Sequence, residues 1–422
     1  MAESAKYQLE ELSPKRWIAV LCILLMHAIC MGSAVLPGAY SEIIIGGWGV
    51  SPGAFVQLTM CSFLAGAIMS IPAGILADRF GVTKVLGIAM VIAFVSSVAR
   101  VFATQAESFP LVFVFSFLIG TGLAGMNANS VKFLQPWFKH TMSTGMTLYV
   151  SGAGIGVVSL MYFAGALFPT DPTAMFTATS VVFAAACVVW FAFARMPKDY
   201  VTIKDDYSAK AIKTVCTNKI LILVSLAMVL TMASSASYAG NVPVVFIGKG
   251  VNPADAAIWA SILNIVGMPS NWIAGPLADK IKRIKPVFIT MAVVGSVFLI
   301  IGWMLPLGAY TLPLIMVGAF IQWGNIGLVK GSVGLIPTLP KQFLGTAGGI
   351  QTFFQNLGAY LIPSFLFTPL SLGADGSSVT EIFFVLCAVF VIASAVVFLF
   401  VPELGLKGKL MQEKMAEAGP VE

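Results

Sequence analysis

Long apolar stretches alternate with short polar connections from residue 17 to residue 401 of the chain. Each stretch is about 20 residues long, the length at which an α-helix crosses the hydrocarbon core of a bilayer. We therefore predict twelve membrane-spanning helices and an all-α integral membrane protein. The predicted spans are 17–37, 54–77, 85–103, 109–131, 144–167, 174–194, 219–240, 254–277, 286–305, 311–332, 344–367 and 381–401.

The longest polar interruption covers residues 195–218 and separates six predicted spans from six others. It is rich in Lys and Asp, which is typical of a connection in water. The predicted organisation is an N-terminal six-helix bundle at 1–194, a cytoplasmic linker at 195–218, and a C-terminal six-helix bundle with a cytoplasmic tail at 219–422.

Two sequence patterns recur at an interval close to half the chain. The segment Gly74-Ile-Leu-Ala-Asp-Arg-Phe-Gly-Val-Thr-Lys84 is echoed 201 residues later by Gly275-Pro-Leu-Ala-Asp-Lys-Ile-Lys-Arg283. The pattern Asn127-x4-Lys132 in the fourth span is echoed 198 residues later by Asn325-x4-Lys330 in the tenth. Such repetition indicates two parallel six-helix halves, related by an axis along the membrane normal.

The composition excludes a soluble protein, because 58% of the residues are hydrophobic, only 10% are charged, and the mean hydropathy is +0.94. The net charge of +6 reflects topology: 20 of the 24 Lys and Arg residues fall beside the termini and the even-numbered connections. Cytoplasmic segments of membrane proteins carry this excess. We expect both termini in the cytoplasm, a location in the cell membrane with the lipid bilayer as surroundings, and no nucleic acid as a partner.

Charged side chains inside a span mark function, because burying charge in hydrocarbon is costly. No Asp or Glu is expected in a span interior, so the candidates are Lys132, Lys330, Arg100 and the titratable His27. One lysine from each half, facing a central cavity, could clamp an anion. The alternative is that Lys132, Lys330 and Arg100 reach the headgroups, and that His27, near the midplane, is a packing residue.

Uncharged polar side chains at similar depth are further candidates for substrate binding, although such residues also hold membrane helices together. They are Asn127, Asn325, Gln322, Tyr149, Asn264, Gln351 and Gln355. The six cysteines are scattered without a CxxC pair, and the two histidines, His27 and His140, form no metal-ligand pattern. No cofactor or metal is expected.

The segment from Gly74 to Lys84 resembles the loop 2–3 signature of the major facilitator superfamily, departing from it at Thr83, where a basic residue is usual. The resemblance implies two pseudo-symmetric six-helix bundles and a conformational latch that favours the outward-facing state. Asp78 could face a helix N-terminus of the other half; the alternative is that the charged residues are cytoplasmic anchors. The latch residues would be Gly74, Asp78, Arg79, Gly81 and Lys84, and in the second copy, which lacks the internal glycine, Gly275, Asp279, Lys280 and Arg283.

A second resemblance concerns residues 125–156, which contain Pro136-Trp-Phe and the glycine-rich Ser151-Gly-Ala-Gly-Ile-Gly156. This segment is similar to the fourth and fifth helices of anion and carboxylate permeases in the superfamily, of the oxalate–formate, nitrate or cyanate type. The arginines that nitrate carriers use in spans two and eight are absent here.

The function expected is secondary active transport by alternating access. An enzyme would need a nucleophile and base or a metal cluster, and a receptor would need an output domain; the sequence shows neither. The cationic residues favour a small organic anion, a mono- or dicarboxylate, as substrate. The alternatives are an inorganic anion, such as nitrate or cyanate, and a neutral polar solute. A co- or counter-transported ion is compatible with this function, and a single six-plus-six chain is expected to act as a monomer.

Overall fold

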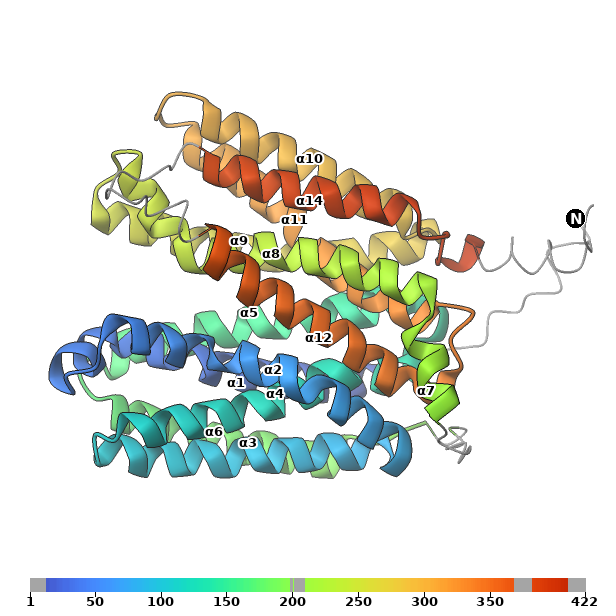
Figure 1. Cartoon of the computed structure of the whole chain (residues 1–422), viewed down its shortest axis with the longest axis horizontal. Coiled ribbons are helices and arrows are strands. Elements are labelled where there is room, and N and C mark those ends of the chain that lie inside the picture. The colour runs from blue at the N-terminus through green and yellow to red at the C-terminus, as the bar shows by residue number, and fades with distance from the viewer. Residues whose placement is uncertain (1–12, 198–199, 201–208, 368–381, 409–422) are drawn as a thin grey trace, which may run out of the picture.

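The computed structural model describes residues 13–197, 200, 209–367 and 382–408 (Figure 1). Twelve long helices lie within these residues, one in each predicted span. The first six are α1 (Arg16–Val35), α2 (Pro52–Phe80), α3 (Val82–Gln105), α4 (Phe109–Phe138), α5 (Met142–Leu167) and α6 (Pro172–Phe193). The others are α8 (Lys219–Gly248), α9 (Pro253–Ile281), α10 (Lys285–Met304), α11 (Thr311–Ser332), α12 (Leu344–Ile362) and α14 (Phe383–Leu399).

Shorter elements lie between these helices. The short helix α7 (Ala209–Cys216) packs against α12 and α8. The 3-10 turn η1 (Leu36–Tyr40) continues α1. The other short elements are η2 (Ile43–Gly47), η3 (Lys139–Thr141), η4 (Val333–Leu335), η5 (Lys341–Phe343) and η6 (Pro363–Phe367). The predicted division at 195–218 stays a prediction, since much of that segment lies outside the described residues.

Several helices are longer than the sequence predicts, and this corrects the placement of two acidic residues. Asp78 and Asp279, expected in connections, lie in the last turns of α2 and α9. Gly81 directly follows the last residue of α2, and its φ of 97° is open to glycine at little cost. Lys282, with a φ of 62°, directly follows the last residue of α9, at the position equivalent to Gly81. The sharp turn is therefore kept in the second copy, although glycine is not.

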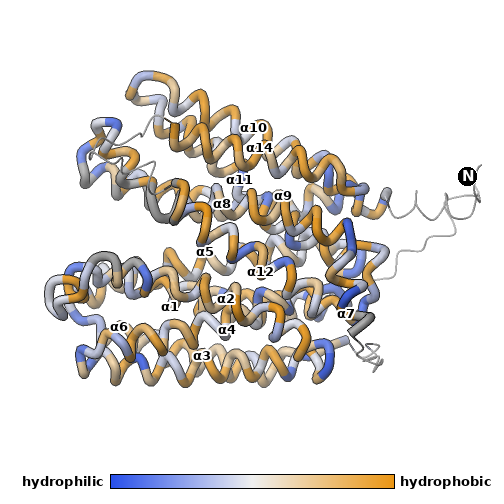
Figure 2. Tube along the Cα trace, in the orientation of Figure 1, coloured by the Kyte–Doolittle hydropathy of each residue, from blue (hydrophilic) through white to orange (hydrophobic). Residues whose placement is uncertain are grey.

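The helices present apolar side chains outward, as a chain that sits in lipid requires. Eight stretches of the described residues are long and apolar enough to cross a membrane, and one of them, Phe109–Leu167, contains both α4 and α5. Along most of their length the helices are hydrophobic, and polar residues gather toward the two ends of the molecule (Figure 2). Because lipid is as apolar as a protein core, exposed Val, Ile and Phe side chains carry no penalty there.

The two sets of six helices meet most extensively where α2 packs against α12 and α5 packs against α9, and α4 with α12 and α5 with α11 add to this contact (Figure 1). Glycines allow the backbones to approach closely. A Cβ atom on Gly74 would collide with the carbonyl oxygen of Gly345, and one on Gly275 would collide with Thr147 and the carbonyl of Ser143. These close approaches position the polar residues described next.

Candidate functional site

Five polar residues from both sets of helices form one hydrogen-bonded group, which we name the central cluster. Its members are His27 (α1), Asn127 (α4), Tyr149 (α5), Lys330 (α11) and Gln355 (α12). The Lys330 ammonium donates to Asn127 Oδ1 at 3.0 Å and to Gln355 Oε1 at 2.9 Å. The Tyr149 hydroxyl also donates to Asn127 Oδ1, at 2.9 Å. Asn127 therefore links the first set of helices to the lysine of the second.

His27 completes the central cluster through Tyr149. Its Nδ1 lies 3.0 Å from the carbonyl oxygen of Tyr149, and the two rings stack with centroids 4.3 Å apart. The stack fixes the phenol ring, so that the hydroxyl points to Asn127. The Lys330 ammonium lies 5.9 Å from the centre of the same phenol ring.

The charge of Lys330 is fully buried, because the side chain is 1% exposed. Its described hydrogen bonds go to amide oxygens, which carry partial and not full negative charge. A buried cation with amide partners is held in place but not neutralised. The central cluster therefore offers positive potential without an opposing carboxylate among the described contacts of Lys330.

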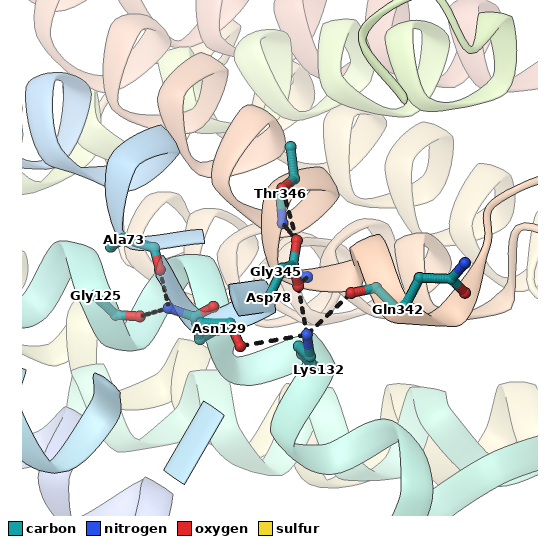
Figure 3. Close-up of polar contacts among 9 residues, drawn as sticks. Ala73, Asp78, Gly125, Asn129, Lys132, Gln342, Gly345 and Thr346 are labelled. Carbon is teal, nitrogen blue, oxygen red and sulfur yellow. Dashed lines mark hydrogen bonds and ion pairs between the residues drawn. The ribbon is translucent and has the colours of Figure 1, made fainter. Parts of the chain in front are cut away.

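A second constellation surrounds Asp78 at the end of α2, and we name it the first gate (Figure 3). Asp78 Oδ1 accepts from the Gly345 amide at 2.9 Å, while Oδ2 accepts from the amide and hydroxyl of Thr346 at 2.7 and 2.6 Å. These amides belong to the first turn of α12, where N–H groups lack helical partners and the dipole favours negative charge. The carboxylate thus caps a helix of the other half.

Lys132 belongs to the first gate and not to the central cluster. Its ammonium lies 2.5 Å from Asp78 Oδ1 and donates across to the carbonyl oxygen of Gln342 at 3.0 Å (Figure 3). The expectation that Lys132 faces a central cavity or the headgroups was wrong, because α2 extends far enough to place Asp78 beside it. The lysines of the two Asn-x4-Lys patterns consequently lie in different sites, Lys132 in the first gate and Lys330 in the central cluster.

A second gate repeats the first with the two halves exchanged. Asp279 Oδ2, at the end of α9, accepts from the amide and the hydroxyl of Thr144 at 2.7 and 2.6 Å. Thr144 lies in the first turn of α5, as Thr346 lies in the first turn of α12. The two threonines are 202 residues apart and therefore form a third repeated feature of the two halves. The repeated Asp motif did not indicate it, because the threonines lie on other helices.

Arg100 is fully buried and does not reach the headgroups. Its guanidinium binds Ser33 and Ser116 and stacks on Phe176, all within the first set of helices.

The remaining polar candidates hold helices together or lack a described partner. Gln322 donates to Ser296 Oγ at 2.9 Å, which ties α11 to α10. Gln351 donates to the carbonyl oxygen of Val329 at 2.9 Å, which ties α12 to α11. Asn325 is fully buried, and no hydrogen bond to its side chain occurs within the described residues. Asn264 lies in α9, but its side chain is outside the described part of the chain.

The basic residues of the signature segments lie at the surface. Arg79, Lys84, Lys280 and Arg283 are exposed. They face water or headgroups beside the gates, while the carboxylates of the buried Asp78 and the half-buried Asp279 make the contacts between the halves.

A chain with two sets of six apolar helices, joined by hydrogen bonds and an ion pair, is a multi-pass membrane protein of the transporter class. The family model of the Major Facilitator Superfamily matches residues 22–363, so the chain belongs to that family. Its members are secondary transporters that sit in the bilayer and carry small molecules, often with coupled ions. The predictions of fold class, transport and absence of enzymatic function are thereby confirmed.

Individual relatives agree with this assignment. The chain is 24% identical over 326 residues to the "Nitrite extrusion protein" of Bacillus subtilis (strain 168), which covers 75% of this chain and 78% of that protein. Among solved structures, the transporter FucP in the outward conformation matches with a TM-score of 0.72 at 12% identity, over 90% of this chain and 98% of that one. The proton:xylose symporter XylE, bound to 6-bromo-6-deoxy-D-glucose, gives 0.70 at 16% identity, over 93% and 97%. These structural likenesses show the fold alone.

Proposed function

We propose that this transporter carries a small monovalent anion and that Lys330 is the positively charged partner of that anion. The observation that carries the proposal is the buried Lys330 ammonium, held by amide oxygens of α4 and α12 at the junction of the two halves. Secondary transporters of this architecture bind substrate where the two halves meet, near the bilayer midplane.

The chemistry of the central cluster favours an anion over a cation or a neutral solute. A carboxylate or nitrite oxygen would replace Asn127 or Gln355 at the Lys330 ammonium and form a charge-assisted hydrogen bond. The Tyr149 hydroxyl would supply a second donor beside it. A cation would meet the positive charge of Lys330, and a sugar would gain little from it.

The charge of the substrate follows from the different partners of the two lysines. A dicarboxylate would require a second cation, and Lys132 is engaged by Asp78 in the first gate. One unneutralised lysine matches one negative charge. We therefore narrow the expected substrates to monocarboxylates and inorganic monoanions; the name of the nitrite extrusion relative supports the inorganic alternative.

The two gates supply the conformational part of the proposal. Both join helix ends of the two halves, and both lie at the end of the molecule that carries most of the Lys and Arg residues. In our proposal this end faces the cytoplasm, so closed gates define an outward-facing state. Entry from the cytoplasm then requires both Asp78 and Asp279 to leave the helix starts that they cap.

Uptake by purified protein in liposomes tests the proposal. Labelled nitrite, nitrate, formate, acetate, oxalate and xylose are compared for the parent, Lys330→Gln and Lys330→Arg, with the exposed Lys213→Gln as matched control. We expect nitrite or a monocarboxylate to be taken up, and Lys330→Gln to weaken its binding roughly 10- to 100-fold, as loss of a charge-assisted bond does. Lys330→Arg should retain part of the activity. Normal uptake by Lys330→Gln, or uptake of xylose and none of the anions, would contradict the proposal.

A further inference from the structure

Arg100 in α3 is a buried cation that the proposed transport site does not use. The side chain is 0% exposed, and its guanidinium contacts three other helices of the first set. Nη1 donates to the carbonyl oxygen of Ser33 at 2.9 Å and to Ser116 Oγ at 3.4 Å, and Nη2 donates to Ser33 Oγ at 2.8 Å. Its Cζ lies 4.3 Å from the centre of the Phe176 ring.

The contact with the Ser33 carbonyl oxygen replaces a backbone hydrogen bond that is missing from α1. In an α-helix this oxygen would accept the N–H of residue 37, four positions later. Residue 37 is proline, which has no N–H. A carbonyl left without a donor inside a bilayer is costly, and neighbouring side chains restore the missing bond where proline breaks a membrane helix. Arg100 Nη1 supplies that bond.

The geometry of the chain changes at the same place. Helix α1 ends at Val35, and the 3-10 turn η1 begins at Leu36, with Pro37 as its second residue. Tyr40, at the end of η1, stacks edge-on against Phe176 and donates its hydroxyl to the carbonyl oxygen of Phe168, just after α5. Phe176 thus contacts both the Arg100 guanidinium and the end of η1.

We propose that Arg100 is a positioning residue that substitutes for the N–H missing at Pro37 and fixes η1 to α3, α4 and α6. With this bond in place, the change from α-helix to 3-10 turn after Val35 is held rigid, and η1 moves together with the first set of helices. An arginine suits the task because its planar fork donates at once to the Ser33 carbonyl and to two hydroxyls. The role assigned here differs from substrate binding, which the charge of Arg100 alone would also allow.

A double-mutant cycle between Arg100 and Pro37 tests the proposal. In Pro37→Ala the amide of residue 37 can bond Ser33, so Arg100 becomes dispensable. We expect Arg100→Gln to lower the thermal unfolding temperature in detergent by several degrees and to raise hydrogen–deuterium exchange in residues 34–41 roughly tenfold. In the Pro37→Ala background, the same substitution should have less than half of each effect. Ser33→Ala, which keeps the carbonyl, serves as the control and should cost less than Arg100→Gln.

Nitrite uptake separates positioning from substrate binding. If Arg100 positions η1, Arg100→Gln lowers Vmax, leaves KM within about twofold, and is rescued by Pro37→Ala. If Arg100 binds substrate, KM rises and Pro37→Ala brings no rescue, which overturns the proposal. Should Arg100→Gln yield no folded protein, recovery of folded protein in the double variant supports the proposal, and failure to recover it contradicts the proposal. The proposal is also contradicted if Arg100→Gln has the unfolding temperature and the hydrogen–deuterium exchange rates of the parent.

Discussion

At the scale of single residues, the two gate carboxylates have different surroundings although they occupy equivalent positions. Asp78 binds an ammonium in addition to the first turn of α12. The described contacts of Asp279 are with the first turn of α5, and a cation is not among them. Removing one partner of a buried ion pair leaves the other charge uncompensated, which costs more than the loss of a cap. The first gate is therefore the more sensitive of the two.

Asp78→Asn is expected to destabilise the protein by about 3–5 kcal/mol, since it strands the Lys132 charge. Asp279→Asn should cost about 1 kcal/mol or less, because the amide oxygen of Asn still accepts from Thr144 and only the interaction of the charge with the dipole of α5 is lost. Denaturant unfolding in detergent measures both. Lys132→Met combined with Asp78→Asn should recover part of the loss, because the stranded charge is gone. If the two aspartate variants lower the free energy of unfolding equally, the contact between Lys132 and Asp78 does not contribute to stability.

At the scale of helices, the gates form only because glycines let two helix pairs approach. Gly74 on α2 faces the backbone of Gly345 on α12, and Gly275 on α9 faces Ser143 on α5. Backbone atoms cannot move aside as a flexible side chain can. A larger residue at either position must therefore separate the helices and weaken the closed gate.

Gly74→Val should shift the protein toward the state in which the first gate is open. Ser70, fully buried on α2 and adjacent to Gly349, reports this shift as Ser70→Cys. We expect maleimide labelling of that cysteine to be roughly tenfold faster in the Gly74→Val background, a free-energy change of about 1.4 kcal/mol. Gly165→Val is the matched control, because nothing lies within 4 Å of a Cβ atom there. Unchanged labelling would mean that the close approach does not control the gate.

At the scale of the whole molecule, local features were predictable from the sequence and long-range partners were not. Apolar stretches fix helix position, because length and hydropathy are local properties. The convergence of Asn127 and Lys330, 203 residues apart, depends on how helices pack across the two halves. The Asn-x4-Lys repeat suggested equal roles for Lys132 and Lys330, but equivalent positions acquired different neighbours.

The orientation in the membrane decides what the closed gates mean. The excess of Lys and Arg predicts that the gate end and α7 face the cytoplasm. Cys216 at the end of α7 is exposed and makes a natural reporter. A membrane-impermeant maleimide should label Cys216 in inside-out vesicles and not in intact cells. Gln105 is exposed at the end of α3 that lies far from the gates, so Gln105→Cys should be labelled in intact cells and not in inside-out vesicles. Gln105→Cys is made in a Cys216→Ser background, so that Cys216 does not react in that variant. If Cys216 reacts from outside intact cells, the orientation is inverted, and the gates described here close the external entrance instead.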